Sequence, residues 1–242
     1  TPSSAGATTI NVAAGVFTDA TGNPNTISDE FNWTYDNVIP TITITSSTVS
    51  SGSTTNDSTI ALTFTSSEST TDFVVGDVSV SNGTLSNFSG SGTTYTATFT
   101  PLADGETTID VAAGEFTDSV GNANSAATQF TWTFDGTAPV LTQVTAIATP
   151  TNDTTPSYVF TTSEAGTIST SISEGFSTST SAATGSNQTI TFNTLSEGTY
   201  AGKTITVTDL AGNSASLTIP EFVIDTTAPV ANASSLSDVT AE

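Results

Sequence analysis

The side chains that could do chemistry in this chain are carboxylates and amides in a loop that occurs three times. Each loop begins with Thr-Asp and ends with Gly-Asn, at residues 18–23, 117–122 and 208–213. A further Asp follows each loop, shortly before a proline. Carboxylates, amide carbonyls and backbone carbonyls are the oxygen ligands that calcium prefers. The candidate calcium ligands in the loops and in the segments after them are Asp19, Asp118, Asn122, Asp209, Asn213, Asp36, Asp135 and Asp225.

The elements that must position these loops are short strands. Apolar and polar residues alternate along the chain, which predicts strands with one buried face, and helical periodicity is nowhere sustained. In the middle of the chain the strands are marked by Ile42 and Ile44, by Ile60, Leu62 and Phe64, by Phe73 and Val75, by Val78 and Val80, by Tyr95, Ala97 and Phe99, by Ile109 and Val111, and by Phe130, Trp132 and Phe134. Asn82-Gly83 predicts a two-residue hairpin, because both positions tolerate positive φ.

The last third of the chain repeats this plan. Its expected core pairs are Tyr158 and Phe160, Ile168 and Ile172, Ile190 and Phe192, Ile205 and Val207, and Phe222 and Ile224. Short strands at this spacing, with turns rich in Asn, Asp and Gly, predict a β-sandwich. The predicted fold class is all-β, with tandem immunoglobulin-like β-sandwiches arranged end to end.

An internal repeat sets the expected domain boundaries. Residues 1–40 align without a gap with residues 100–139. Residues 1–39 are therefore expected to be the C-terminal part of an Ig-like repeat, whose missing strands precede Thr1 or come from another chain. Residues 40–137 form a complete repeat, residues 138–227 form a complete repeat of a second subtype, and residues 228–242 start a further repeat. No signal segment or membrane-spanning run is visible, so the cellular address is expected to lie elsewhere in a longer polypeptide.

The sandwich topology predicts that the acids meet at the ends of the domains. In immunoglobulin order, the B–C and F–G loops lie at the end where the chain enters the sandwich. This end gathers Asp36, Glu68, Asp118 and Asn122 in one repeat, and Asp135, Glu164, Asp209 and Asn213 in the next. Carboxylates without a counter-ion repel one another. A calcium ion at each joint between domains would remove the repulsion and stiffen the linker.

A structural interpretation of the same residues stays open. Asp and Asn in turns also cap backbone N–H groups through their own side chains, with Gly121 and Gly212 supplying positive φ. The acidic turns at the opposite ends of the sandwiches fit either interpretation: Asn56, Asp57, Asp104, Asn152, Asp153 and Glu197.

Charge and composition exclude several functions. The chain has 23 acidic residues and one basic residue, Lys203, for a formal net charge of -22. Such a chain cannot neutralise phosphates, so nucleic acid is excluded as a partner, and docking on anionic membranes is disfavoured. Cys and His are absent, which removes disulfides, thiolates, imidazole bases and the common zinc sites. A catalytic carboxylate pair needs an aromatic-lined cleft, whereas these acids lie in turns, so the chain is predicted not to be an enzyme.

Several short segments of the sequence resemble the bacterial Ig-like repeats of very large surface adhesins. They are Phe64-Thr65-Ser66-Ser67-Glu68, the segment 82–88, Val111-Ala112-Ala113-Gly114 and Phe116-Thr117-Asp118. The resemblance implies an extracellular stalk at the cell surface or in a secreted protein, with calcium at the joints and neighbouring repeats of the same chain as partners. Residues 235–242 resemble the opening of another repeat found in surface proteins of Bacteroidota.

The leading functional hypothesis is mechanical. The domains would act as a spacer that displays an adhesive tip, rigidified by calcium. The alternative is an adhesive module that binds carbohydrate or ice through the exposed threonines of residues 41–45 and 94–100. Surface glycans or another protein chain would then be partners.

Overall fold

The protein divides into two compact units, residues 1–134 and residues 135–242. The structure is a computed structural model and describes residues 2–230. Within this range the secondary structure is β-strand apart from one 3-10 helix, η1 (Val75–Asp77). No helix of the described residues is long and apolar enough to cross a membrane. The prediction of an all-β chain is confirmed. The predicted start of a further repeat at residues 228–242 falls mostly outside the described residues.

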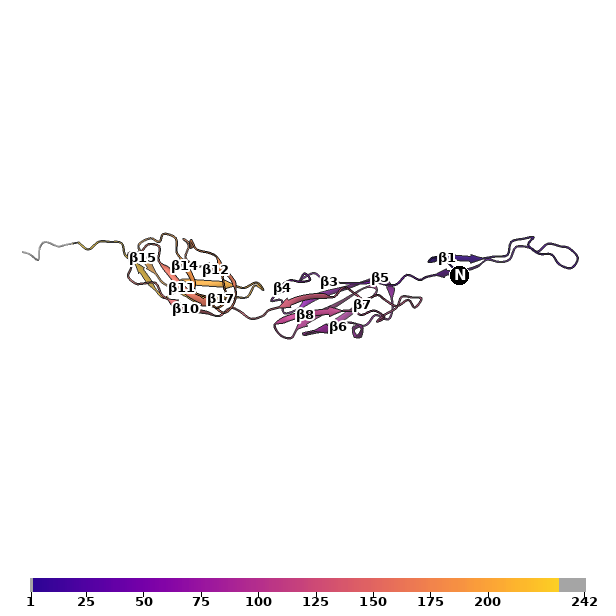
Figure 1. Cartoon of the computed structure of the whole chain (residues 1–242), viewed down its shortest axis with the longest axis horizontal. Coiled ribbons are helices and arrows are strands. Elements are labelled where there is room, and N and C mark those ends of the chain that lie inside the picture. Colours follow the sequence, from indigo (N-terminus) through magenta and orange to yellow (C-terminus); the bar gives the residue numbers. More distant parts are fainter. Residues whose placement is uncertain (1, 231–242) are drawn as a thin grey trace, which may run out of the picture. The chain divides into compact units, whose positions relative to one another are not determined.

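The first unit begins with an antiparallel hairpin (Figure 1), whose strands are β1 (Gly6–Ile10) and β2 (Phe31–Tyr35). Its register pairs Thr8 with Trp33 and Ile10 with Phe31. The loop between the strands carries the first copy of the acidic motif. Residues of this loop bond to each other, as in the bridge between Thr18 and Pro24.

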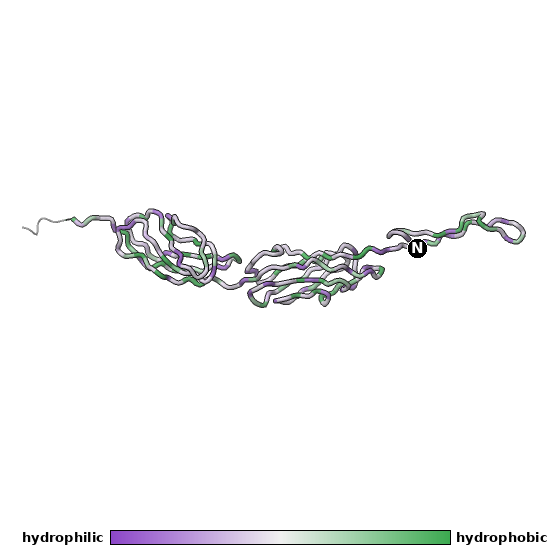
Figure 2. The backbone as a smooth tube through the Cα atoms, in the orientation of Figure 1, coloured by the Kyte–Doolittle hydropathy of each residue, from purple (hydrophilic) through white to green (hydrophobic). Residues whose placement is uncertain are grey.

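The rest of the first unit is a sandwich of two sheets. One sheet has the order β3 (Ile42–Ser46), β5 (Ile60–Thr70), β7 (Gly83–Pro101). The other has the order β4 (Thr54–Thr55), β9 (Phe130–Phe134), β8 (Gly105–Asp110), β6 (Ser79–Ser81). Alternate residues of β3, β5 and β9 are buried, and Figure 2 shows hydrophobic positions interleaved with polar ones along the strands. The buried aromatic rings fill the space between the sheets, where Phe99 and Trp132 meet edge to face at 4.9 Å.

Two local predictions in this sandwich are wrong. Phe73 and Val75 do not begin a strand, because the chain turns into η1 there, and the Asp77 carboxylate accepts the N–H of Val74 at 2.7 Å. Phe73 is nevertheless buried in the core.

Asn82-Gly83 is likewise not a two-residue hairpin, because the strands on its two sides belong to different sheets. β6 pairs with β8, whereas β7 pairs with β5. Asn82 does have positive φ, at 52°, but it redirects the chain from one sheet to the other. The reversal lies further on, at Gly90 and Gly92, where β7 folds back and Ser86 Oγ bonds to the carbonyl of Thr98.

The second unit is a sandwich on the same plan. One sheet has the order β10 (Leu141–Thr145), β11 (Ser157–Thr162), β14 (Gln188–Thr191). A second has the order β13 (Ser181–Ala182), β12 (Gly166–Thr170), β16 (Thr204–Thr208), β17 (Ser214–Thr218). A third is the pair β15 (Gly198–Tyr200) and β18 (Phe222–Ile224). All the predicted core residues are buried. Ile172 and Phe192 lie just beyond the ends of β12 and β14. The alternation of apolar residues therefore predicts burial beyond the last residue that pairs with a neighbouring strand.

Candidate metal centres

Three predicted ligands of the first sandwich come together in the structure. One carboxylate oxygen from each of Asp36, Glu68 and Asp118 lies within 4.8 Å of the others. Asp118 is buried, and the other two acids are half-buried. These residues are far apart in the sequence, so the fold assembles the cluster.

The backbone explains why these acids meet. Asp36 is the first residue after β2. Glu68 lies near the end of β5, where the pairing with β7 shifts register between Thr65 and Thr70. Asp118 lies in the loop between β8 and β9.

The Asp118 loop is built around its carboxylate. Oδ1 accepts the backbone N–H groups of Val120, Gly121 and Asn122 at 2.8, 2.8 and 2.9 Å. Gly121 has φ of 96°, which a side chain would disfavour. The amide nitrogen of Asn122 bonds to Oδ2 of Asp118 at 2.8 Å and to the carbonyl oxygen of Asp36 at 3.4 Å. In this arrangement Asn122 presents a donor to the acids and orients them.

The pKa values of Asp118 and Glu68 are shifted in opposite directions. Burial raises the pKa of the Asp118 carboxyl, but the hydrogen bonds from Asn122 and from the loop backbone outweigh it, so the net shift is downward. Desolvation raises the pKa of Glu68, and the charges of Asp36 and Asp118 raise it further. The cluster therefore holds negative charge under repulsion, which a bound cation would relieve.

The second sandwich has a matching cluster. Asp135, Glu164 and Asp209 each place a carboxylate oxygen within 4.8 Å of the other two. Asp209 Oδ1 accepts the N–H groups of Gly212 and Asn213 at 2.7 and 2.8 Å. The Asn213 amide bonds to Asp209 Oδ2 at 3.0 Å and to the carbonyl oxygen of Asp135 at 2.8 Å. The same residue types thus occupy the same places in both sandwiches.

The other two predicted ligands stand outside these groups. The Asp19 carboxylate accepts bonds from Thr21 and Asn23, and these bonds, those of Asn23 foremost, hold its pKa well below the ordinary value. Asp225 accepts the N–H of Thr227 at 3.0 Å. Within residues 2–230, the groups of three acids close enough to share a metal ion are the two described above.

Three of the acids at the opposite ends accept hydrogen bonds within the protein. Asp57 accepts a bond from Thr55 Oγ1 at 2.9 Å, and Asp153 accepts the N–H of Thr155 at 2.8 Å. Glu197 accepts the hydroxyls of Thr226 and Thr227 at 2.7 and 2.9 Å. The contacts of Asp57 and Asp153 lie within their own turns and support the turn-capping interpretation, whereas those of Glu197 join it to the segment after β18.

A further polar contact was missed by the sequence reasoning. The Asp72 carboxylate accepts the Thr70 hydroxyl at 2.6 Å and the N–H and hydroxyl of Thr117 at 3.1 and 2.7 Å. It fixes the base of the Asp118 loop. Asp72 belongs to no repeated motif, so no sequence signal distinguishes it from a surface acid.

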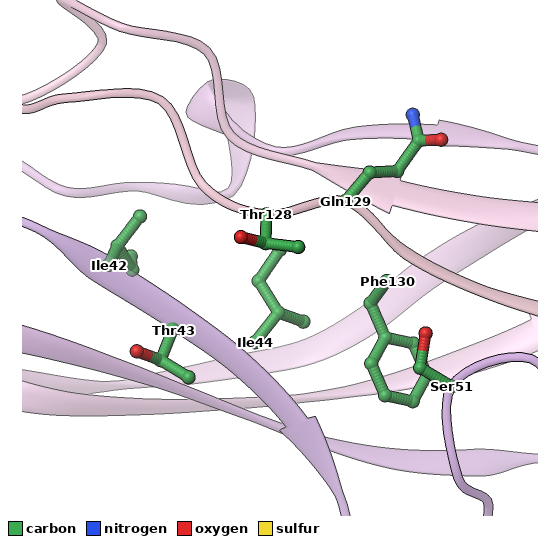
Figure 3. A pocket seen from close by; sticks show the side chains of 7 residues that line it. All are labelled: Ile42, Thr43, Ile44, Ser51, Thr128, Gln129 and Phe130. Atoms are coloured by element: carbon green, nitrogen blue, oxygen red, sulfur yellow. The ribbon is translucent and has the colours of Figure 1, made fainter.

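Two pockets among the described residues are lined by one acid at most. One pocket of about 250 Å³ (Figure 3) lies between β3 and the start of β9 and is lined by Ile42, Thr43, Ile44, Ser51, Thr128, Gln129 and Phe130. Another, of about 410 Å³, lies beside β12 and has Asp209 as its one acidic lining residue.

The donor sets suit calcium. Each cluster supplies three carboxylates, which are hard oxygen ligands, and no nitrogen or sulfur ligand takes part. Asp36, Glu68 and Asp118 would hold one ion, and Asp135, Glu164 and Asp209 would hold another.

The fold and these clusters define a class: tandem β-sandwiches of immunoglobulin type with an acidic group at one end of each. Residues 36–134 and residues 144–226 match two family profiles, both described as bacterial Ig-like domain. The matches together cover most of the chain, which therefore belongs to the bacterial Ig-like domain family. The sequence prediction of such repeats is confirmed.

Two solved structures are similar to the chain. One is the adhesin InvE of Yersinia pseudotuberculosis, with 16% identity, coverage of 76% of this chain and 58% of that chain, and a TM-score of 0.27. The other is SGBP-B of the mixed-linkage glucan utilization locus of Bacteroides ovatus, in complex with a mixed-linkage heptasaccharide; it has 14% identity, coverage of 91% and 53%, and a TM-score of 0.22. The chain thus spans little more than half the length of these structures. A comparison with curated proteins gives no match.

Proposed function

We propose that this chain is a non-catalytic spacer segment of a large extracellular adhesin, at the cell surface or secreted, in which each Ig-like domain binds a calcium ion. The observation that carries the proposal is the recurrence of one acidic cluster in two sandwiches of different subtypes. Turn capping accounts for one acid in each loop. It does not account for a second and third carboxylate brought to the same place twice.

Charge is the first argument for a cation. The chain has one basic residue to set against 23 acids. Close carboxylates in such a chain raise each other's pKa or take up a cation. The pKa of Glu68 is raised by desolvation first and then by the charges of Asp36 and Asp118. Calcium, with its preference for six to eight oxygen ligands, would be completed by backbone carbonyls and water.

The position of the acids gives the cation a mechanical role. Asp36 directly follows β2, and Asp135 directly follows β9, so each belongs to the segment that leads into a sandwich. An ion shared with Glu68 and Asp118, or with Glu164 and Asp209, would fix that segment to two other parts of the same domain. Calcium would therefore restrict the linkers and set the stiffness of the spacer.

The geometry offers little support for catalysis. A glycosidase-type mechanism needs two carboxyl groups facing each other across a substrate cleft. Asp118 and Asp209 instead lie in loops whose own backbone N–H groups bond to their carboxylates. A spacer needs no such cleft.

Calcium titration by calorimetry, together with thermal unfolding, tests the proposal. At a calcium concentration about 100 times Kd, the expected stabilisation of a domain is about 2.7 kcal/mol, or a Tm rise on the order of 10 °C. Asp209→Asn should remove one of two binding events, whereas Glu221→Gln, an exposed acid outside both clusters, should leave both. Equal melting curves in calcium and in chelator would refute the calcium role.

A second candidate function rests on the threonines of the outer sheet face. The strand register places Thr43, Thr65 and Thr94 in one row and Thr45, Thr63 and Thr96 in the next. All but Thr63 are exposed. A flat face of regularly spaced hydroxyl and methyl groups could bind a carbohydrate or ice. A glycan array and an ice-recrystallisation assay, each run with Thr65→Ala, would separate this binding module from a spacer, since a spacer gives no signal in either.

A further inference from the structure

The hairpin of β1 and β2 is a copy of the hairpin of β8 and β9. Both are antiparallel with the same register, because Thr8 pairs with Trp33 in the first and Thr107 pairs with Trp132 in the second. The aromatic pairs also correspond: the rings of Phe31 and Trp33 lie 5.6 Å apart, and their counterparts lie 5.8 Å apart. The backbone of the first hairpin is therefore that of a complete repeat.

The two hairpins differ in what covers their apolar face. Side chains that the second hairpin buries are open in the first. The exposed fractions are 58% for Ile10 against 0% for Ile109, 63% for Phe17 against 1% for Phe116, and 67% for Phe31 against 6% for Phe130. A contiguous apolar surface of this kind marks a contact site rather than a normal solvent face.

The complete repeat shows which elements do the covering. Phe99 of β7 packs edge to face on Trp132 at 4.9 Å. Phe73, which follows β5, packs on Phe116 at 5.1 Å. Both contacts come from residues that precede β8 in the chain.

A polar contact in the complete repeat also comes from a residue that precedes β8. Asp72 accepts the N–H and the hydroxyl of Thr117. The first hairpin has Thr18 at the position of Thr117, in an identical Phe-Thr-Asp sequence. The hairpin thus keeps one partner of each of the two aromatic contacts, and it keeps the donor groups of the carboxylate contact.

We propose that the exposed face of the β1–β2 hairpin binds a three-stranded sheet of the β3–β5–β7 type, supplied by polypeptide that precedes residue 1 in the same chain. The order of the complete repeat supports this source, since β7 ends at Pro101 and β8 starts at Gly105, with one short connection between them. The bound sheet places one aromatic ring on Trp33, a second on Phe17 and a carboxylate on Thr18. This association does not depend on calcium.

The experiment uses Trp33 as its probe. Trp132→Phe leaves Trp33 as the one tryptophan, because the chain has two. Fluorescence of this variant is compared with that of a fusion in which a second copy of residues 40–99 stands directly before Thr1, the join that the repeat alignment gives. In the fusion, Trp33 emission should shift to shorter wavelength and acrylamide quenching should fall severalfold. Unchanged emission would overturn the proposal.

Two controls make the result specific. The fusion with Phe99→Asp in the added copy should leave Trp33 half-buried, as it is in the unfused chain, and full burial of Trp33 in this control would contradict a sheet of the proposed type. Hydrogen exchange of residues 6–10 and 31–35, measured without the Trp132→Phe change, should slow in the fusion, and unaltered exchange would count against it. Sedimentation of the unfused chain tests the source of the sheet: a dimer with buried Trp33 would assign the face to a second copy instead.

Discussion

The side-chain amide of Asn213 donates a hydrogen bond to the backbone carbonyl oxygen of Asp135, 2.8 Å away. The same amide nitrogen bonds to the carboxylate of Asp209 at 3.0 Å. Asn213 therefore connects the acidic loop after β16 to the first residue of the second unit. The first unit repeats the relationship with Asn122, Asp118 and Asp36.

Replacing Asn213 should loosen the segment at Asp135. Asn213→Ala removes both bonds and should lower the free energy of unfolding of the second unit by about 1 kcal/mol. Amide exchange at Thr137, whose N–H bonds to Asp135 Oδ1, should become faster. Chemical denaturation and hydrogen exchange measure these effects. Asn187→Ala, at an exposed position, is the matched control and should change neither; equal exchange at Thr137 in all three proteins would contradict the prediction.

Glu68→Gln should change stability in opposite directions with and without calcium. The pKa of Glu68 is raised by desolvation and by Asp36 and Asp118, so its charge costs stability in the folded protein. In chelator, the neutral variant should therefore melt at a higher temperature than the wild type at pH 7. In calcium, the variant should melt at a lower temperature than the wild type, because a calcium ligand is lost. A loss of stability in both conditions would indicate a purely structural role.

The same shift predicts a pH dependence. Because the folded pKa of Glu68 lies above the unfolded value, its unfavourable contribution is full at neutral pH. It disappears as pH falls through the folded pKa. The Tm difference between Glu68→Gln and wild type in chelator should thus shrink toward zero on acidification. Melting curves from pH 7 to pH 4 measure it, with Glu115→Gln as an exposed control of equal charge change; a difference that stays constant with pH would exclude the linkage.

Two phenylalanines at equivalent repeat positions should differ strongly on substitution. Phe130→Ala empties a buried site and should destabilise the first sandwich by about 3–5 kcal/mol. Phe31→Ala affects a side chain that is 67% exposed and should change stability by less than about 0.5 kcal/mol. Urea denaturation of the same chain measures both. Similar losses for the two variants would mean that the face around Phe31 is already covered.

Gly83 and Gly76 form a further matched pair. A Cβ at Gly83 would overlap the Phe99 ring and lie 2.6 Å from the carbonyl oxygen of Thr100. Gly83→Ala should therefore cost about 1–3 kcal/mol. At Gly76 a Cβ would meet nothing within 4 Å, so Gly76→Ala should be close to neutral. Thermal unfolding tests the difference, and a neutral Gly83→Ala would show that the fold-back of β7 can move.

The sequence predicted the acidic clusters because their geometry follows from order and alternation. Asp118 lies in a loop and Glu68 near the end of a strand that an immunoglobulin-type sandwich brings to one end, and Asp36 lies in the segment that enters there. The calcium that these acids would bind remains a prediction. Asp19 lies in a copy of the acidic loop and Asp225 in a copy of the segment before a proline, but neither belongs to a group of three acids within residues 2–230.

The sequence did not predict which strands pair with one another. Asn82-Gly83 has the local chemistry of a hairpin, yet β6 and β7 join different sheets, because the choice of partner depends on which distant strands pack behind each one. The sequence pattern predicts that Phe73 lies in a strand. Phe73 lies instead in an irregular segment before η1, from which its side chain is buried in the core.

By itself, the sequence determined which side chains face inward, since alternation along a strand assigns each residue to a face whatever the strand's neighbours are. It therefore fixed the class of fold, the core residues and the loops that carry acid. Only the tertiary structure decided what lies against each face. Phe31 and Phe130 begin similar strands, FNWTY and FTWTF, with the same register, but one is exposed and the other buried, because burial depends on packing between strands distant in the chain.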